Sequence, residues 1–238
     1  MAGDSLVFIH GSGDSASLWD ATIAALPGVT TAALDLPGHG ALIVEPGPER
    51  MSVGDYATLA RMAMERLDLS GLCVVGHSLG AAIALRLAAD APALVRRLVI
   101  VGGGARLRVL PALLAETQTA PDVAAQRLVG LGFAPEHEAQ AGAYLATRQP
   151  TAPGILHRDL VACDAFDITT ELAKITQPTL VVVGAEDRLT PPKYATFLAE
   201  RMPHAQAVVV PGAGHYVPVE APDTLASVIH HWLAEPSR

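Results

Sequence analysis

The stretch Leu72-Cys73-Val74-Val75-Gly76-His77-Ser78-Leu79-Gly80-Ala81 decides the fold of this chain. Its first four residues are apolar without alternation, which is typical of a strand buried on both faces. From Leu79 to Ala89 apolar residues recur at helical spacing. The stretch therefore predicts a buried strand, a tight turn at Ser78 and a helix.

The turn has the pattern G-x-S-x-G, from Gly76 to Gly80. Between a strand and a helix, this pattern exposes the serine hydroxyl above the edge of a sheet, and the glycines avoid clashes in a strained turn. The following helix points its N-terminus at the site, which favours developing negative charge. A serine that only caps a helix would give the same local sequence. The strand-turn-helix setting favours Ser78 as a catalytic nucleophile.

The rest of the chain repeats this alternation of strand and helix. Short apolar runs predict six strands, at residues 6–9, 30–34, 72–75, 98–101, 179–183 and 207–210. Amphipathic stretches predict helices at residues 15–26, 53–67, 79–89, 193–202 and 223–233. The alternation predicts an α/β fold with a mostly parallel, doubly wound sheet of about six strands. Right-handed crossovers place the loops after the strands along one carboxyl edge.

Residues 105–167 break the alternation, because they show helical patterns and no convincing strand. Five prolines divide this segment into short helices, at positions 111, 121, 135, 150 and 153. We interpret the segment as a helical lid inserted over the sheet edge, with residues 1–104 and 168–238 forming the core. An excursion without a role in binding is the alternative, but loops of this length are usually functional.

A serine nucleophile needs a base, and the base needs an acid that orients it. His215, in Gly212-Ala213-Gly214-His215-Tyr216, lies in a loop between the last strand and the last helix and is the predicted base. Asp187 follows the strand at residues 179–183 and is the predicted acid. Glu186 is its competitor, and we prefer Asp187 because it stands directly before the start of the next helix. The order Ser, Asp, His is the one used by this arrangement of strands.

Hydrolysis through a serine also needs backbone N–H groups that stabilise an oxyanion. We expect one from Leu79, directly after the nucleophile, and one from Ser12, in the glycine-rich loop His10-Gly11-Ser12-Gly13. Gly11 and His77 are the predicted substrate-binding positions beside them, although the His77 side chain is expected to point elsewhere. The loop fits neither G-x-G-x-x-G nor a P-loop, so a nucleotide site is not expected.

Composition narrows the classes of partner. With 16 Lys and Arg against 24 Asp and Glu, the formal net charge is −8, which argues against nucleic acid and anionic membranes as partners. No apolar run is long enough to span a bilayer, and the first residues do not resemble a signal peptide, so we expect a cytoplasmic protein. Cys73 and Cys163 lack metal-ligand spacing and are read as free thiols. No metal or cofactor is predicted.

Together, these motifs resemble the α/β-hydrolase superfamily, particularly small bacterial esterases and 3-oxoadipate enol-lactonase-like hydrolases. The resemblance rests on the residues discussed above and on Trp19, Pro178, Glu220, Pro222 and Asp35-Leu36-Pro37-Gly38-His39-Gly40. It covers almost the whole chain except the lid. Family members usually carry two antiparallel strands before the loop with His-Gly, and since that loop begins at residue 10 we expect those strands to be absent.

The resemblance implies a cofactor-free hydrolase that cleaves a small-to-medium carboxylic ester or lactone through an acyl-enzyme on Ser78. Two alternatives stay open. The same residues serve elimination or carbon–carbon cleavage in the menaquinone-pathway and hydroxynitrile lyases, and some family members only bind ligands. The sequence assigns no role to Arg106, Arg108, His137 or His157, and it does not define the oligomeric state.

Overall fold

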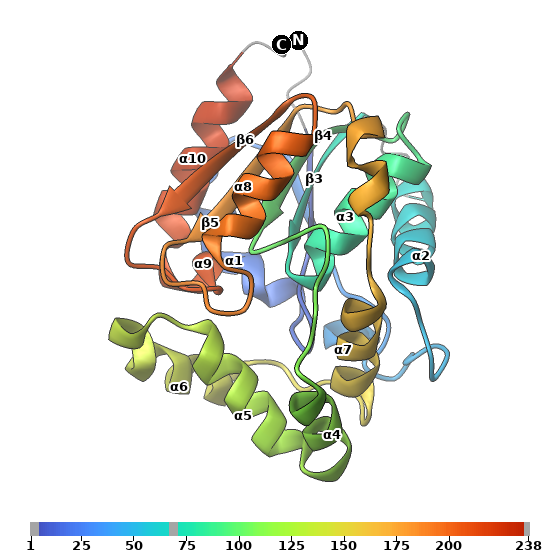
Figure 1. The fold of residues 1–238 in the computed structure, drawn as a ribbon, viewed down its shortest axis with the longest axis vertical. Helices are drawn as coiled ribbons and strands as arrows, with labels where there is room; N and C mark the ends of the chain where they lie inside the picture. Colours follow the sequence, from blue (N-terminus) through green and yellow to red (C-terminus); the bar gives the residue numbers. More distant parts are fainter. Residues whose placement is uncertain (1–4, 67–70, 236–238) are drawn as a thin grey trace.

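The protein is built around one parallel sheet, seen in a computed structural model that describes residues 5–66 and 71–235 (Figure 1). Its strands are β1 (Leu6–Ile9), β2 (Thr31–Leu34), β3 (Leu72–His77), β4 (Val95–Val101), β5 (Thr179–Gly184) and β6 (Ala205–Val210). Their order across the sheet is β2-β1-β3-β4-β5-β6, and every neighbouring pair is parallel. The predicted, mostly parallel α/β sheet of about six strands is therefore confirmed.

Alternate residues of the central strands pack into two separate hydrophobic cores, one on each face of the sheet. Phe8, Val75 and Val182 belong to the core on one face of the sheet. Ile9, Val74 and Val181 belong to the core on the other face. This two-sided burial explains why the strands read as continuous apolar runs. Removing each such side chain from water contributes on the order of 1.5–3 kcal/mol.

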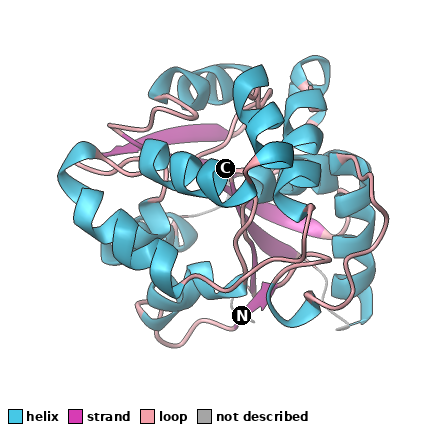
Figure 2. Ribbon diagram, turned by 90° about the horizontal axis from the view of Figure 1, so that it is seen from below, coloured by secondary structure: helices cyan, strands magenta, loops and turns pink. Residues whose placement is uncertain are grey.

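Helices cover both faces of the sheet (Figure 2). The helices α1 (Asp20–Ala24) and α10 (Pro222–Ala234) lie on one face, and α2 (Val53–Arg66), α3 (Leu79–Asp90) and α8 (Pro192–Arg201) lie on the other. Short turns complete the core, namely η1 (Ala16–Trp19), η2 (Gly40–Leu42), η4 (Thr169–Lys174) and α9 (Val217–Glu220). Residue 67, the predicted end of one helix, lies outside the described residues.

Two predicted elements differ most from the observed ones, whereas the bounds of the others agree within two residues. The helix predicted at residues 15–26 is a 3-10 turn followed by a five-residue α-helix. It ends early because Pro27 disfavours helical backbone at the residue before it. Strand β4 starts at Val95, three residues before the prediction, and includes the buried Arg97, which donates to the carbonyls of Trp232 and Leu233 at the end of α10. A charged residue in a buried strand is therefore compensated by helix-terminal carbonyls.

Residues 105–167 form the predicted helical segment between β4 and β5. It contains α4 (Pro111–Thr119), α5 (Pro121–Gly132), η3 (Pro135–His137), α6 (Glu138–Thr147) and α7 (Ile155–Ala165). Three of these elements begin with a proline at the first helical position, as the sequence pattern indicates. The segment lies below the sheet in Figure 1, beyond the carboxyl ends of the strands. Its role as a lid stays a prediction.

A buried polar cluster fastens α7 to the core. Asp159 is fully buried and accepts hydrogen bonds from the backbone N–H of Gly13 (3.1 Å) and the Tyr56 hydroxyl (2.5 Å). The His39 ring nitrogen Nε2 lies 2.9 Å from the same carboxylate. Arg158 donates to the Tyr56 hydroxyl and to the carbonyl of Pro37. A buried carboxylate with this many partners fixes the helix relative to the loop that follows β1.

Candidate active site

Ser78 stands at a strained turn between β3 and α3. Its φ of 54° is the only positive φ of a non-glycine residue within the two described ranges. A Cβ at Gly80 would lie 2.2 Å from the carbonyl oxygen of Ile9, and one at Gly76 would lie 2.1 Å from the carbonyl oxygen of Gly80. Both positions therefore need glycine. Strain of this kind is held by the surrounding structure and concentrates at functional sites.

His215 and Asp187 form a buried pair at the same edge of the sheet. The His215 ring nitrogen Nδ1 lies 2.9 Å from Asp187 Oδ2 and 3.1 Å from the Thr190 hydroxyl. The carboxylate also accepts hydrogen bonds from the backbone N–H groups of Leu189 and Thr190. Burial raises the pKa of Asp187, but His215 and these hydrogen bonds outweigh it and hold the pKa below its usual range. Glu186, the competing acid, is exposed.

This geometry sets the tautomer of the imidazole. Because Asp187 Oδ2 is an ionised acceptor, His215 Nδ1 carries the proton and Nε2 keeps a lone pair. His215 and Ser78 line the same cavity. The arrangement can therefore remove a proton inside this cavity and stabilise the imidazolium that results.

The predicted oxyanion groups lie beside Ser78. Ser12 lines the cavity, in the loop after β1, and Leu79 begins α3. Among the described residues, the backbone N–H groups of Ser12 and Leu79 donate no hydrogen bond to another protein group. A Cβ at Gly11 would lie 3.2 Å from the Ser78 Cβ, so this loop approaches the turn closely. Gly11 is not among the residues that line the cavity, whereas His77 is.

His77 and His10 are buried histidines that form hydrogen bonds with the loops around the candidate site. His77 Nε2 donates to the backbone carbonyl of His215 (3.0 Å), so it braces the loop that carries the imidazole. His10 Nδ1 donates to the carbonyl of Gly11 and Nε2 accepts from the N–H of Leu36. Burial, together with a neighbouring histidine, lowers the pKa of each ring to about 3. Both rings are therefore neutral at pH 7.

These depressed pKa values predict an acid-sensitive fold. In the unfolded chain His10 takes up a proton near pH 6.5, while in the folded protein it does so only near pH 3. The unfolded state therefore binds more protons between these values, and stability falls as the pH falls through this window. From pH 7 to pH 5 the loss from His10 is roughly 2 kcal/mol. We expect His10→Gln to reduce by about this amount the change in unfolding free energy between pH 7 and pH 5, measured by urea denaturation.

His230→Gln is the matched control, because His230 is an exposed histidine on α10. If both variants keep the pH dependence of the wild type, His10 is not the group responsible.

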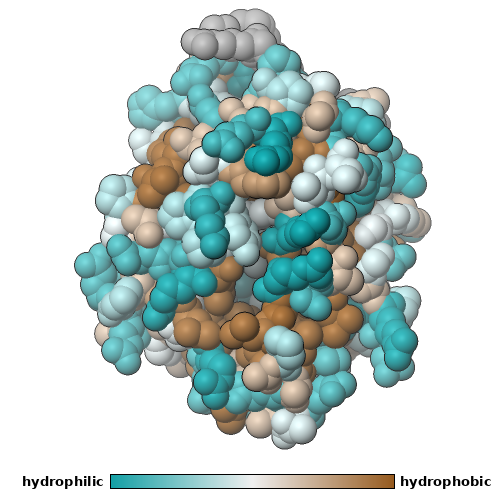
Figure 3. Space-filling model, in the orientation of Figure 1, coloured by the Kyte–Doolittle hydropathy of each residue, from teal (hydrophilic) through white to brown (hydrophobic). Residues whose placement is uncertain are grey.

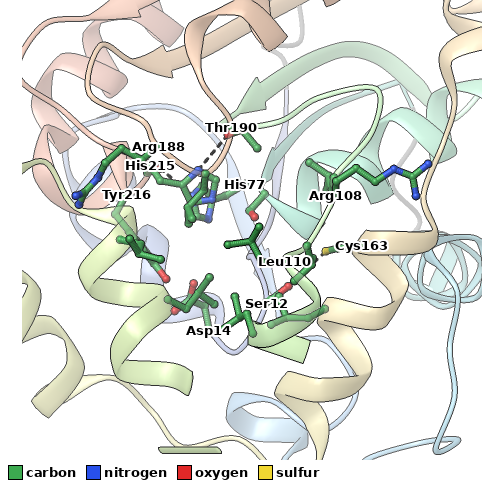
Figure 4. Close-up of a pocket in the computed structure, with 18 residues that line it drawn as sticks. Ser12, Asp14, His77, Arg108, Leu110, Cys163, Arg188, Thr190, His215 and Tyr216 are labelled. Carbon is green, nitrogen blue, oxygen red and sulfur yellow. Dashed lines mark hydrogen bonds between the residues drawn. The ribbon is translucent and has the colours of Figure 1, made fainter. Parts of the chain in front are cut away.

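The cavity has a volume of about 330 Å³, at the small end of ligand pockets. Its polar lining includes Ser12, Asp14, Ser78 and His215 (Figure 4). Its apolar lining comes from Leu107, Val109, Leu110, Leu113, Leu128, Leu131, Leu160 and Leu189. Hydrophobic side chains also gather on the lower half of the face shown in Figure 3, where α4 and α5 lie in Figure 1. The helical segment thus supplies most of the apolar wall.

The four residues to which the sequence assigned no role each contact another protein group in the structure. Arg106 pairs with Asp167 (2.8 Å) where the helical segment begins and ends. Arg108 lines the cavity and donates to the backbone carbonyl of Asp164. His157 contacts the Thr117 hydroxyl inside the helical segment, and His137 contacts the Gln140 side chain.

The sequence analysis missed three residues that shape the site. Thr190 contacts both Asp187 and His215, and its signal is a hydroxyl residue three positions after the acid. Asp14 lines the cavity two residues after Ser12, directly beyond the predicted oxyanion loop His10-Gly11-Ser12-Gly13. Asp159 holds the Gly13 N–H, and its signal is the adjacent pair Arg158-Asp159 inside an apolar helical pattern.

The fold and this edge of the sheet define an α/β hydrolase. A model of the alpha/beta hydrolase family matches residues 6–228, and the chain belongs to this family. It is 27% identical to the pimeloyl-[acyl-carrier protein] methyl ester esterase of Nitrosomonas europaea, over 94% of each chain.

Solved structures agree with this assignment. The structure of a thermophilic esterase is 35% identical, covers 96% of this chain and 88% of its own, and superposes with a TM-score of 0.79. The enol-lactonase from Burkholderia xenovorans LB400 is 22% identical and covers 99% of this chain and 93% of its own. With a TM-score of 0.89, it supports the fold. The protein is therefore a hydrolase of the α/β type with esterase-like relatives. Within residues 5–66 and 71–235, no helix has the length and apolar character needed to cross a membrane.

Proposed function

We propose that the protein hydrolyses small-to-medium carboxylic esters or lactones through an acyl-enzyme on Ser78. The observation that carries the proposal is a serine on a strained turn that shares one cavity with a buried, carboxylate-bound imidazole. The esterase names of the relatives support the same class of reaction.

The first half-reaction forms the acyl-enzyme. The Ser78 hydroxyl attacks the carbonyl carbon while His215 Nε2 accepts its proton, and Asp187 stabilises the imidazolium. The carbonyl oxygen becomes an oxyanion that accepts hydrogen bonds from the N–H groups of Ser12 and Leu79. When the tetrahedral intermediate collapses, the bond to the alcohol oxygen breaks and His215 protonates this leaving group.

The second half-reaction releases the acid. Water attacks the acyl carbonyl, His215 takes the water proton, and the Ser78 oxygen leaves with that proton. In a lactone the alcohol and the acyl group are one molecule, so the ring opens in the first step and one hydroxy acid leaves in the second.

The cavity size predicts the preferred acyl chain. Since about 330 Å³ of largely apolar space is available, we expect p-nitrophenyl ester hydrolysis to peak at an intermediate chain length between acetate and decanoate. A fluorophosphonate should add one label per chain, located at Ser78 by peptide mass spectrometry. A folded protein that hydrolyses none of these esters, or that carries its label on another residue, would contradict the proposal.

A further inference from the structure

One end of the cavity is polar and buried. Asp14 is 1% exposed and lines the cavity, in the same loop as Ser12. Its Oδ1 accepts a hydrogen bond from the Tyr144 hydroxyl (2.5 Å) and lies 3.7 Å from Nη1 of Arg148. Both partners come from α6 and the residue directly after it. Asp14 thus joins the helical segment to the loop after β1.

This anchoring contact uses only one of the two carboxylate oxygens. Among the described residues, Oδ2 of Asp14 makes no hydrogen bond. Since Asp14 lines the cavity and Oδ2 is not among the fully enclosed polar atoms without a partner, this oxygen is open to a hydrogen-bond donor inside the cavity. The hydroxyl end of Tyr216 points toward Asp14 across the same end of the cavity, and Arg108 and Cys163 lie on the opposite side (Figure 4). The two side chains present oxygen atoms to whatever fills this end.

The charge of this end limits the ligand. Burial raises the pKa of Asp14 above its usual range, and the Arg148 guanidinium and the hydrogen bond from Tyr144 offset only part of this rise. The ion pair with Arg148 already balances the carboxylate. A cationic ligand would add an uncompensated buried charge, and an anionic ligand would be repelled by Asp14. A neutral hydrogen-bond donor adds no buried charge and is not repelled by Asp14.

We propose that Asp14 and Tyr216 form a subsite for a neutral hydroxyl group on one arm of the ester, while the leucine-lined part of the cavity takes the other arm. The hydroxyl donates to Asp14 Oδ2 and accepts from the Tyr216 hydroxyl. The preferred substrate is therefore a hydroxylated ester with one apolar arm. This inference rests on the proposed function, since the ester must reach Ser78.

The test uses pairs of esters in which a hydroxyl replaces a methyl group of nearly equal size. On the alcohol arm the pair is 2-hydroxyethyl hexanoate and propyl hexanoate. On the acyl arm it is ethyl 3-hydroxybutanoate and ethyl 3-methylbutanoate. We expect the wild-type protein to prefer the hydroxylated member of one pair by about tenfold in kcat/KM, because a donor to a buried carboxylate is lost in its isostere. The pair that shows the preference identifies the arm.

Variants then locate the effect. Asp14→Asn should weaken the preference, because its amide keeps an acceptor for Tyr144 but offers the ligand hydroxyl a neutral donor in place of a charged acceptor. Tyr216→Phe should reduce the preference while keeping the ring against Phe133. Asp20→Asn is the matched control on the exposed start of α1 and should keep the full preference.

A purely structural role for Asp14 predicts a different pattern. Tyr144→Phe removes the contact to α6 but leaves Oδ2 of Asp14 facing the cavity, so we expect it to keep the preference. Equal hydrolysis within both pairs, an unchanged preference in Asp14→Asn, or a full loss in Tyr144→Phe would overturn the subsite. If the wild-type protein hydrolyses none of the four esters or the p-nitrophenyl series, the proposed function itself fails.

Discussion

Ser78→Ala is expected to lower kcat for p-nitrophenyl ester hydrolysis by about 10⁴- to 10⁶-fold. The substitution removes the oxygen that would form the acyl-enzyme, so neither half-reaction can proceed by that route. The oxyanion donors and the cavity stay in place, and they leave only a residual rate above that of water. Initial rates over a range of substrate concentrations separate this loss in kcat from any change in KM.

The control is Ser227→Ala, because Ser227 is an exposed serine on α10 outside the cavity. It should keep wild-type kcat. Ser78→Ala should also keep the thermal stability of the wild type, since alanine fits the same space and no side-chain hydrogen bond of Ser78 is present within the described residues. A Ser78→Ala protein that retains a tenth of the wild-type kcat would rule out Ser78 as the nucleophile.

The sheet could be predicted because its central strands are short and buried on both faces. Each such apolar run is bounded by turn residues, so the neighbouring sequence alone indicates where the strand lies. The errors occurred where a local rule was overridden by packing. The start of β4 was predicted too late because Arg97 interrupts the apolar run. The carbonyls that accept its hydrogen bonds lie at the end of α10, more than a hundred residues away. Trp19 was placed in a regular helix, but its fully buried ring lies in a 3-10 turn against Phe8.

The candidate site was predictable to the extent that it is built from loops at strand ends. Ser78, Asp187 and His215 each follow a strand, and parallel strands bring their carboxyl ends to one edge. The contacts of Asp14 and Asp159 were not predictable, because they depend on how the helical segment packs. Tyr144 lies 130 positions from Asp14, and no local pattern indicates that the two side chains meet.

The same packing couples the helical segment to the candidate base. The backbone N–H of His215 donates to the carbonyl of Gly132 (2.6 Å), at the end of α5. Glu220 accepts from the N–H groups of Gly214 and Ala134, so one carboxylate holds both chain segments together. A Cβ at Gly214 would lie 2.4 Å from the carbonyl oxygen of Gly132. The wall of the cavity and the loop that carries the imidazole are therefore held together by direct contacts.

Asp187→Asn is expected to lower kcat by about 10³- to 10⁴-fold with a smaller effect on the fold. The asparagine carbonyl can still accept from the N–H groups of Leu189 and Thr190, so the loop keeps its local hydrogen bonds. Its amide then faces His215 Nδ1 as a donor. The imidazole must accept there and carry its proton on Nε2, where it can no longer take the proton of a serine hydroxyl.

Glu186→Gln is the matched control for this prediction, because it removes the adjacent carboxylate, which is exposed and forms no hydrogen bond or ion pair with His215 within the described residues. It should retain kcat within about twofold, since an exposed charge near a site contributes little. Steady-state rates on the best p-nitrophenyl ester, with circular dichroism to confirm folding, measure both variants side by side. A larger loss in Glu186→Gln than in Asp187→Asn would reassign the acid. Equal activity in all three proteins would contradict the assignment of Asp187 as the acid that orients the imidazole of His215.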